Sequence, residues 1–236
     1  MYLDVVELRS FYAGPLGAVA SRLISRVLRD LWPDVAGRRI LALGYATPFL
    51  GPFVSKAERV IAMMPAAQGV VRWPREGGNL AALADERELP VPDATFDLVV
   101  AAHLLENSGE SPRLLREIWR ILAPQGRLLL IVPNRRGIWA RLERTPFGFG
   151  RPFSRGQLTR LLHDSLFVPV RWAGALTLPP SDNRLMIKSL LGFERMGRRL
   201  GGNFAGVLIA EAEKTIYAAK RQPSRASVQR PVLIPR

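Results

Sequence analysis

Short apolar runs and amphipathic stretches follow one another along the middle of the chain. Residues 96–102 (FDLVVAA) and 127–132 (RLLLIV) are nearly continuous apolar runs, which are typical of strands buried on both faces of a parallel sheet. Between them, apolar side chains recur at helical spacing from Leu114 to Leu122. A strand, a helix and a strand of these lengths predict a right-handed crossover within a parallel sheet.

Residues that begin and end helices support this division. Ser111 and Pro112 predict the start of the middle helix, because a hydroxyl side chain is a good N-cap and proline fits the first helical position. Pro124 and Gly126 predict its end. The same signals predict helices at 5–32 (broken near Gly14 and Pro15), 154–163 and 185–200, and strands at 39–44, 59–64, 79–84, 167–178 and 204–217.

The composition fits one globular domain. A chain of 236 residues, of which 48% are hydrophobic, can bury one good core. No apolar run approaches the roughly 18 residues that cross a bilayer, and the first residues lack the pattern of a signal peptide, so we expect a cytoplasmic protein. The chain has no cysteine and only two histidines, His103 and His163, which argues against disulfides, a thiolate nucleophile and a metal site.

Positive charge is concentrated in the second half of the chain. Residues 135–236 hold 19 of the 34 basic side chains but only 6 of the 20 acidic ones. This imbalance suggests an acidic partner, such as RNA or an anionic membrane surface. The alternative is an arginine-rich composition (30 Arg against 4 Lys) on a solvated face. Residues 185–200 predict a basic amphipathic helix, and residues 222–236 a disordered basic tail.

Four short motifs in the middle of the chain resemble those of one enzyme family. They are Leu89-Pro-Val-Pro-Asp93, Phe96-Asp-Leu-Val99, His103-Leu-Leu-Glu106 and Leu122-Ala-Pro-Gln-Gly126. In this order they resemble class I S-adenosylmethionine-dependent methyltransferases of the type 11 group. The resemblance implies a Rossmann-like α/β fold, with a seven-stranded, mostly parallel sheet, helices on both faces and an antiparallel last strand. It also implies a single domain over residues 1–221, with inserted segments at about 135–155 and 183–203.

The turn after the first predicted strand departs from the family pattern. The family has three glycines there, which let the backbone approach S-adenosylmethionine closely. Gly44 keeps the first glycine, whereas Ala46 and Pro48 replace the other two, and Ala42 stands where an acidic residue often precedes the turn. Proline fixes a dihedral angle and removes a backbone donor. The resemblance nevertheless implies that the cofactor contacts Gly44, Tyr45, Ala46 and Thr47.

The other expected cofactor contacts follow three later strands. Met64 stands at the strand end where the family usually has a carboxylate that binds the ribose hydroxyls. Either Gln68 or backbone groups hold the ribose instead, or cofactor affinity is reduced or lost. Asp85 matches the acidic residue that binds the adenine amino group in the family, and Glu86 is a close competitor. Ala102 lies at the carboxyl end of the fourth strand, the edge at which open α/β sheets bind ligands.

His103 and Glu106 are the candidate catalytic residues. Methyl transfer from a sulfonium needs a base only where the acceptor must lose a proton, and positioning supplies most of the remaining acceleration. His103 is the best-placed base, and the alternative is a structural histidine. The ring of Tyr45 could face the sulfonium. Phe11 and Tyr12 either cover the cofactor or only pack a helix on the sheet.

Residues 135–153 interleave arginines with Trp139, Phe147, Phe149 and Phe153. Such a segment could bind an acidic or aromatic substrate, lie on an anionic membrane or contact RNA. It could equally be a loop that covers the sheet.

Three functions remain open on the sequence. The first is S-adenosylmethionine-dependent methyl transfer, by in-line displacement, to a small or lipid-like acceptor. The second is a pseudo-methyltransferase, a binding or regulatory module that has lost activity. The third is an RNA-binding or RNA-modifying protein that uses the basic half. The sequence identifies neither the acceptor atom nor the oligomeric state.

Overall fold

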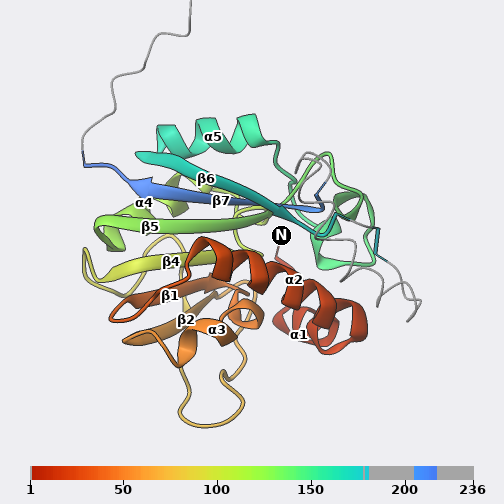
Figure 1. Cartoon of the computed structure of the whole chain (residues 1–236), viewed down its shortest axis with the longest axis horizontal. Helices are drawn as coiled ribbons and strands as arrows, with labels where there is room; N and C mark the ends of the chain where they lie inside the picture. The colour runs from red at the N-terminus through yellow and green to blue at the C-terminus, as the bar shows by residue number, and fades with distance from the viewer. Residues whose placement is uncertain (1, 178, 181–204, 217–236) are drawn as a thin grey trace, which may run out of the picture.

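Seven strands form one sheet in the order β3-β2-β1-β4-β5-β7-β6. The structure is a computed structural model that describes residues 2–177, 179–180 and 205–216 (Figure 1). The pairs from β3 to β5 are parallel, and β7 is antiparallel to both of its neighbours. This arrangement confirms the predicted fold class. The strands are β1 Arg39–Gly44, β2 Arg59–Pro65, β3 Ala81–Ala84, β4 Phe96–Ala102, β5 Leu122–Pro133, β6 Phe167–Ala175 and β7 Val207–Lys214.

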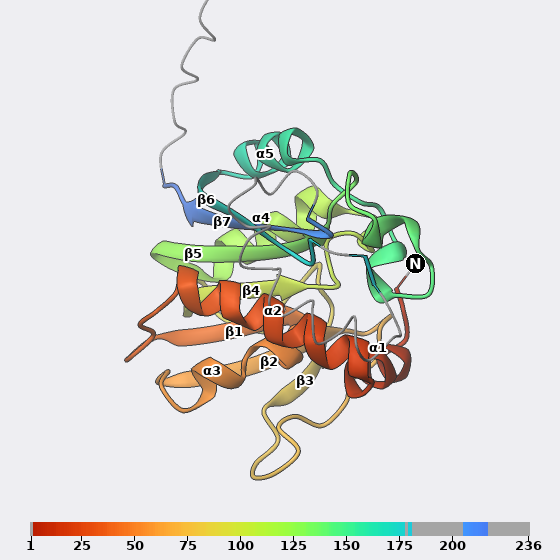
Figure 2. The ribbon, with the colours of Figure 1, turned by 45° about the vertical axis from the view of Figure 1, so that its right-hand side comes forward.

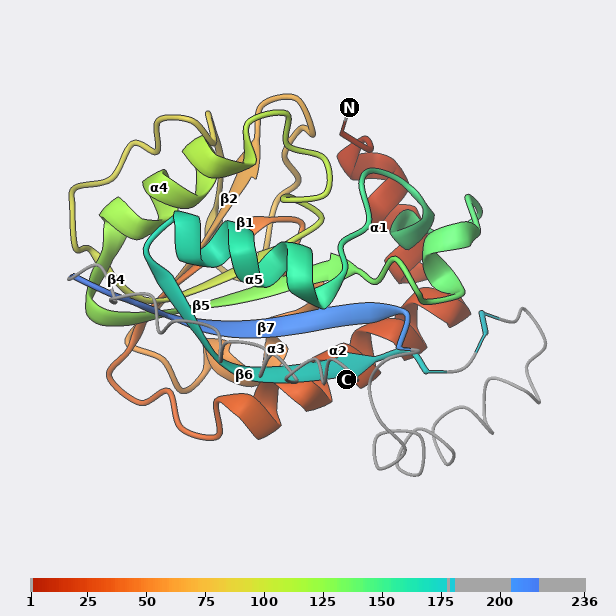
Figure 3. The ribbon, with the colours of Figure 1, turned by 90° about the horizontal axis from the view of Figure 1, so that it is seen from above.

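Helices cover both faces of the sheet. Seen from above, α4 and α5 lie on one face and α2 and α3 on the other, while α1 lies at the edge where the parallel strands end (Figure 3). The α-helices are α1 Val5–Ala13, α2 Pro15–Leu31, α3 Gly51–Val54, α4 Ser111–Ile121 and α5 Arg155–Asp164. Three 3-10 turns, η1 Thr47–Phe49, η2 Trp139–Arg141 and η3 Pro146–Gly148, complete the described elements.

The two faces of the sheet carry separate hydrophobic cores. Successive side chains of a strand point to opposite faces, so in β4 Leu98 and Val100 pack with α2, whereas Val99 and Ala101 pack with α4 and α5. A strand with no solvated face is apolar at nearly every position. Burial on both faces therefore explains the apolar runs from which the strands were predicted.

The break between the first two helices falls where the sequence predicts it. Gly14 lies between them in an extended conformation, and Pro15 begins α2. Gly17 packs so closely on α1 that a Cβ there would lie 2.0 Å from the carbonyl oxygen of Phe11. The break lets α2 lie along the sheet while α1 turns across the strand ends (Figure 2).

Two predicted boundaries of α4 are wrong. Ser111 is the first helical residue and not the N-cap, which is Glu110, and no side chain caps this helix. The helix ends at Ile121, and β5 begins at once, so that Pro124 and Gly126 lie within the strand. The pairing with β4 jumps there, because Phe96 pairs with Leu122 and Leu98 with Arg127. The residues expected to end a helix instead form an irregularity in a strand.

The helix α5 has the cap that α4 lacks. The Oγ of Ser154 accepts a hydrogen bond from the amide of Gln157, and the Gln157 side chain accepts one from the amide of Ser154. We therefore expect Ser154→Ala to lower the free energy of unfolding by about 1 kcal/mol. Ser111→Ala is the matched control and should change it by a few tenths of a kcal/mol at most. Urea denaturation measures both, and equal effects would contradict the assignment of the caps.

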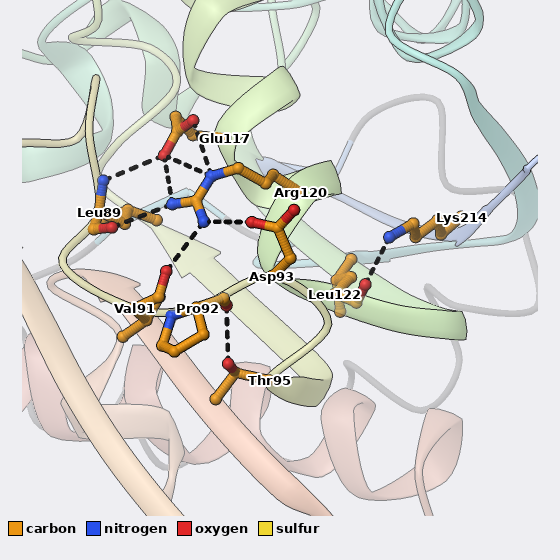
Figure 4. A network of polar contacts seen from close by, with 9 residues as sticks. All are labelled: Leu89, Val91, Pro92, Asp93, Thr95, Glu117, Arg120, Leu122 and Lys214. Carbon is orange, nitrogen blue, oxygen red and sulfur yellow. Dashed lines mark hydrogen bonds and ion pairs between the residues drawn. The ribbon is translucent and has the colours of Figure 1, made fainter.

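The turn before β4 is held by one arginine of α4. The Arg120 guanidinium donates to the carbonyls of Leu89 (3.0 Å) and Val91 (2.9 Å), to the Asp93 carboxylate (2.7 Å) and to Glu117 (Figure 4). Carbonyls of a turn cannot form a ladder, so a side chain has to satisfy them. The Leu89–Asp93 motif is therefore a turn docked on α4.

Some predictions fall outside the described residues. The helix predicted at 185–200, the tail at 222–236 and nearly all of the inserted segment at 183–203 do so. The described part of the chain contains no helix long and apolar enough to span a membrane. The acidic partner and the single domain over residues 1–221 stay predictions.

Candidate functional site

The ends of β1 and β4 meet at a position that only glycine can occupy. Gly44 pairs with Ala102, and the amide of Tyr45 donates to the Ala102 carbonyl at 2.9 Å. Gly44 has a φ of +69°, and a Cβ there would lie 2.3 Å from the Ala102 oxygen and 2.9 Å from the Cβ of Leu104. Two of the residues predicted to bind a cofactor are thus in direct contact at the carboxyl edge of the sheet.

The turn after Gly44 is buried and fixed to α2. Ala46 and Thr47 have almost no exposed surface, and the Ser21 hydroxyl donates to the Pro48 carbonyl at 2.7 Å. The turn continues into η1 and then into α3, which has only four residues. Pro48 and Pro52 supply no backbone donor to the first turns of these elements. The turn therefore presents fewer amide groups than a long helix at this position would.

The end of β2 is closed by the N-terminal helix. Met64 is fully buried and packs with Val5, Leu8 and Tyr45. The cavity between β1, β2 and β3, lined among others by Gly44, Met64 and Glu86, has a volume of about 10 Å³. That is about the space one water molecule requires. The end of β2 therefore has almost no free volume beside the N-terminal helix.

Of the two candidate acids after β3, only Glu86 faces this cavity. Asp85 is exposed and forms a two-pronged ion pair with Arg87, with nitrogen–oxygen distances of 2.8 and 3.0 Å, and this pairing lowers the pKa of Asp85 to about 2. The Glu86 carboxylate instead accepts a hydrogen bond from the hydroxyl of Tyr2 at 2.9 Å. Burial and the neighbouring Glu86 raise the pKa of Tyr2, which stays a neutral donor.

The two candidate catalytic residues form a buried line with Tyr12. The Tyr12 hydroxyl lies 2.7 Å from Nε2 of His103, and Nδ1 of His103 lies 3.5 Å from a carboxylate oxygen of Glu106. His103 is 2% exposed and has a φ of +52°, which is uncommon outside glycine. Such backbone strain gathers at functional sites. Glu106 on the Nδ1 side favours the tautomer with a proton on Nδ1, so that Nε2 accepts from Tyr12.

Two buried amides hold the backbone of His103. Nε2 of Gln68 and Nδ2 of Asn107 both donate to the His103 carbonyl, at 3.0 and 3.4 Å. These bonds fix the orientation of each amide. Among the described residues, four buried atoms of this cluster have no hydrogen-bond partner: Gln68 Oε1, His103 Nδ1, Glu106 Oε2 and Asn107 Oδ1. Buried polar atoms without partners are rare and costly, so the cluster has unused capacity to bind a ligand.

Aromatic rings surround His103. Phe147 lies 5.1 Å from the His103 ring, and Tyr12 stacks on Tyr45 at 5.8 Å. Of the four aromatic residues singled out in the inserted segment, Trp139, Phe147 and Phe153 are buried and Phe149 is 40% exposed. Three of these four rings are therefore packed in the core, which favours the alternative of a loop that covers the sheet. A cleft of about 220 Å³ separates it from α1 beside Phe11.

Comparison with known proteins agrees with this geometry. Residues 44–130 match the model of a methyltransferase domain of the type 11 family. Over residues 44–130 the chain therefore resembles a class I methyltransferase domain of that family. It is 30% identical over 155 residues to a probable S-adenosylmethionine-dependent methyltransferase of Mycobacterium tuberculosis, which covers 63% of this chain and 55% of the relative. It is 27% identical over 129 residues to the demethylmenaquinone methyltransferase of Deinococcus radiodurans, covering 54% and 52%.

A solved structure has the same fold as this chain. It is a methyltransferase of Thermotoga maritima described as a possible histamine N-methyltransferase, with a TM-score of 0.67, 18% identity and coverage of 89% and 96%. The chain spans about half the length of the curated relatives it matches. The comparisons give no support to the alternative of an inactive pseudo-methyltransferase.

The fold brings most of the predicted site residues together. Gly44, Tyr45, Met64, Glu86 and Ala102 gather at one edge of the sheet, next to the His103 cluster. Asp85 does not join them. Sequence reasoning missed Tyr2 and Asn107, for which the sequence offers no signal, because neither belongs to a motif or to a periodic pattern.

Proposed function

We propose that the protein binds S-adenosylmethionine at the edge formed by Gly44, Glu86 and Ala102 and transfers its methyl group to a small or lipid-like acceptor. The buried line of Tyr12, His103 and Glu106 beside that edge carries the proposal. It would supply a base beside the proposed cofactor edge. A cytoplasmic location is part of the same proposal, and cell fractionation tests it.

The polar groups at this edge suit the cofactor, whereas the volume of the closed cavity does not. Glu86 offers a carboxylate, Gln68 an unpartnered oxygen, and the Gly44 turn a close approach of backbone. About 10 Å³ of space cannot hold an adenosine. Binding therefore requires the N-terminal segment to move. Two polar contacts hold it there, from the Tyr2 hydroxyl to Glu86 and from the Val5 amide to the Gln68 carbonyl.

The cofactor supplies an activated methyl group on a positively charged sulfur. The protein then has to hold the acceptor, exclude water and remove a proton. His103 can take the proton on Nε2 once Tyr12 leaves that atom, and Glu106 stabilises the resulting imidazolium from the Nδ1 side. The positive φ and the two amides on the His103 carbonyl fix the ring for this step.

Calorimetric titration with S-adenosylmethionine tests the cofactor site. We expect Glu86→Ala to weaken binding at least about tenfold, because a buried hydroxyl or amine of the ligand would lose its acceptor. Asp85→Ala is the matched control, since its carboxylate points to solvent and to Arg87, and should change the affinity less than about twofold. No binding to the unaltered protein would reject the proposed function, and the reverse ranking of the two variants would restore Asp85 as the contact.

We expect His103→Gln to lower kcat by about 100-fold while the affinity for S-adenosylmethionine changes little. A positioned general base contributes at least this factor. The measurement is a single-turnover rate with labelled cofactor over a range of pH. His163→Gln is the control, because that histidine lies in the last turn of α5, away from the strand ends. Equal kcat values for His103→Gln and the unaltered protein would make His103 structural only.

A further inference from the structure

Tyr12 holds a phenol group against the proposed base. Its hydroxyl lies 2.7 Å from His103 Nε2, and its ring stacks on Tyr45 and meets Phe49 edge-on at 5.6 Å. Burial raises the pKa of Tyr12 well above its ordinary value of 10.0, and the Glu106 carboxylate adds to this effect. Tyr12 is therefore neutral and donates its proton to an accepting nitrogen.

We propose that Tyr12 occupies the acceptor's own position in the closed protein, so that the acceptor is an aromatic hydroxyl compound, a phenol or its fused-ring equivalent. The inference rests on the proposed function and gives it a substrate class. The site that Tyr12 occupies has three matching features: stacked and edge-on ring partners for a flat ring, a hydrogen-bond acceptor at the hydroxyl, and a carboxylate behind that acceptor.

An aliphatic amine, which is protonated at neutral pH, fits this position less well. A protonated amine needs a carboxylate beside its nitrogen. The carboxylate of the cluster, Glu106, lies on the Nδ1 side of the His103 ring, whereas Tyr12 contacts Nε2 on the other side. In the tautomer that carries its proton on Nδ1, Nε2 of His103 accepts a hydrogen bond from a hydroxyl.

Methyl transfer to a phenol balances in atoms and electrons with His103 as the base. A bond forms between the phenol oxygen and the methyl carbon, and the bond from that carbon to sulfur breaks, with its electron pair remaining on sulfur. The phenol proton passes to Nε2 of His103. The products are an aryl methyl ether, S-adenosylhomocysteine and a protonated His103 that later releases its proton to solvent.

Binding of p-cresol to Tyr12→Ala tests the site without the cofactor. p-Cresol is the side chain that this variant lacks, and toluene is the same molecule without the hydroxyl. We expect p-cresol to bind with a millimolar or lower Kd, at least tenfold more tightly than toluene, as measured by NMR titration. Tyr12→Phe, which keeps the ring, should bind neither. Tyr45→Ala opens a neighbouring ring site that lacks the His103 contact and should not discriminate between them.

Equal affinities of Tyr12→Ala for p-cresol and toluene would overturn the inference. It would also be overturned if Tyr45→Ala preferred p-cresol over toluene by the same factor as Tyr12→Ala. Should Tyr12→Ala not fold, Tyr12→Leu replaces it, with phenol and benzene as the probes and the same tenfold criterion. These measurements contain no cofactor, so they do not depend on the proposed activity.

Labelled S-adenosylmethionine then separates the two claims. We expect the folded Tyr12 variant to move label into 4-methylanisole from p-cresol at least tenfold faster than into p-toluidine, the matching amine. Two results would reject the aromatic hydroxyl acceptor without rejecting the proposed methyltransferase activity. One is label in p-toluidine alone, and the other is label in neither probe while calorimetry shows that the cofactor is bound. Absence of cofactor binding would reject the proposed function itself.

Discussion

Replacing Gly44 with alanine is expected to lower the free energy of unfolding by about 2–5 kcal/mol. A positive φ costs a non-glycine residue about 1–2 kcal/mol, and forcing extra atoms into a packed site costs about 1–3 kcal/mol more. The new Cβ would lie 2.3 Å from the Ala102 carbonyl oxygen. That oxygen cannot retreat freely, because it accepts the hydrogen bond from the Tyr45 amide. Urea denaturation followed by circular dichroism gives the value.

Gly37→Ala is the matched control for this change. Gly37 has a φ of +66°, close to that of Gly44, but nothing lies within 4 Å of a Cβ built there. Only the backbone term of about 1–2 kcal/mol should remain. The difference between the two variants therefore measures the contact with the end of β4. If both variants lost the same stability, the close approach of β1 and β4 would not be what requires glycine at position 44.

The sheet could be predicted from the sequence because a buried parallel strand is apolar at nearly every position. The runs at 39–44 and 96–102 have the bounds that the structure gives to β1 and β4. The beginning of α4 could not be placed as well, since Ser111 is the better N-cap by residue type, whereas the helix has Glu110 at this position and no side-chain cap. The turn after β3 shows the same limit. Asp85 and Glu86 are neighbours, and the direction of each carboxylate depends on the turn.

The closed state of the site could not be predicted, because it joins residues far apart in the sequence. Tyr12 and His103 are separated by 91 positions, and Tyr2 and Glu86 by 84. No local pattern reports such pairs. The sequence shows that Met64 stands where the family usually has an acidic residue. It does not show that the N-terminal helix packs against this methionine. A thioether at this strand end lets Val5 and Leu8 pack against it, whereas a carboxylate would have kept the place polar.

A buried carboxylate in β7 should affect stability nearly as much as Gly44 when it is replaced. Glu211 in β7 is fully buried and accepts hydrogen bonds from Trp32 Nε1 (2.9 Å), Arg127 Nη1 (3.1 Å) and Arg171. We expect Glu211→Ala to lower the free energy of unfolding by about 3 kcal/mol. Removing one partner of a buried pair usually costs about 3–5 kcal/mol, and the two partly exposed arginines keep the cost near the lower limit. Glu213→Ala, on the same strand but partly exposed, should cost less than about 0.5 kcal/mol.

The contribution of Glu211 should also depend on pH in a defined direction. Burial alone would raise the pKa of Glu211, but the hydrogen bonds from Arg171 and Trp32 outweigh it and hold the pKa below the ordinary value of 4.5. A pKa that is lower in the folded protein means that the stabilisation is complete above pH 4.5 and is lost as the pH falls through the folded value. Glu211→Gln lacks this titration. The stability gap between the unaltered protein and Glu211→Gln should therefore be constant from pH 8 to about pH 5 and narrow below pH 4.5. A gap that widened on acidification would mean that Glu211 is protonated in the folded protein and that the two arginines do not pair with it.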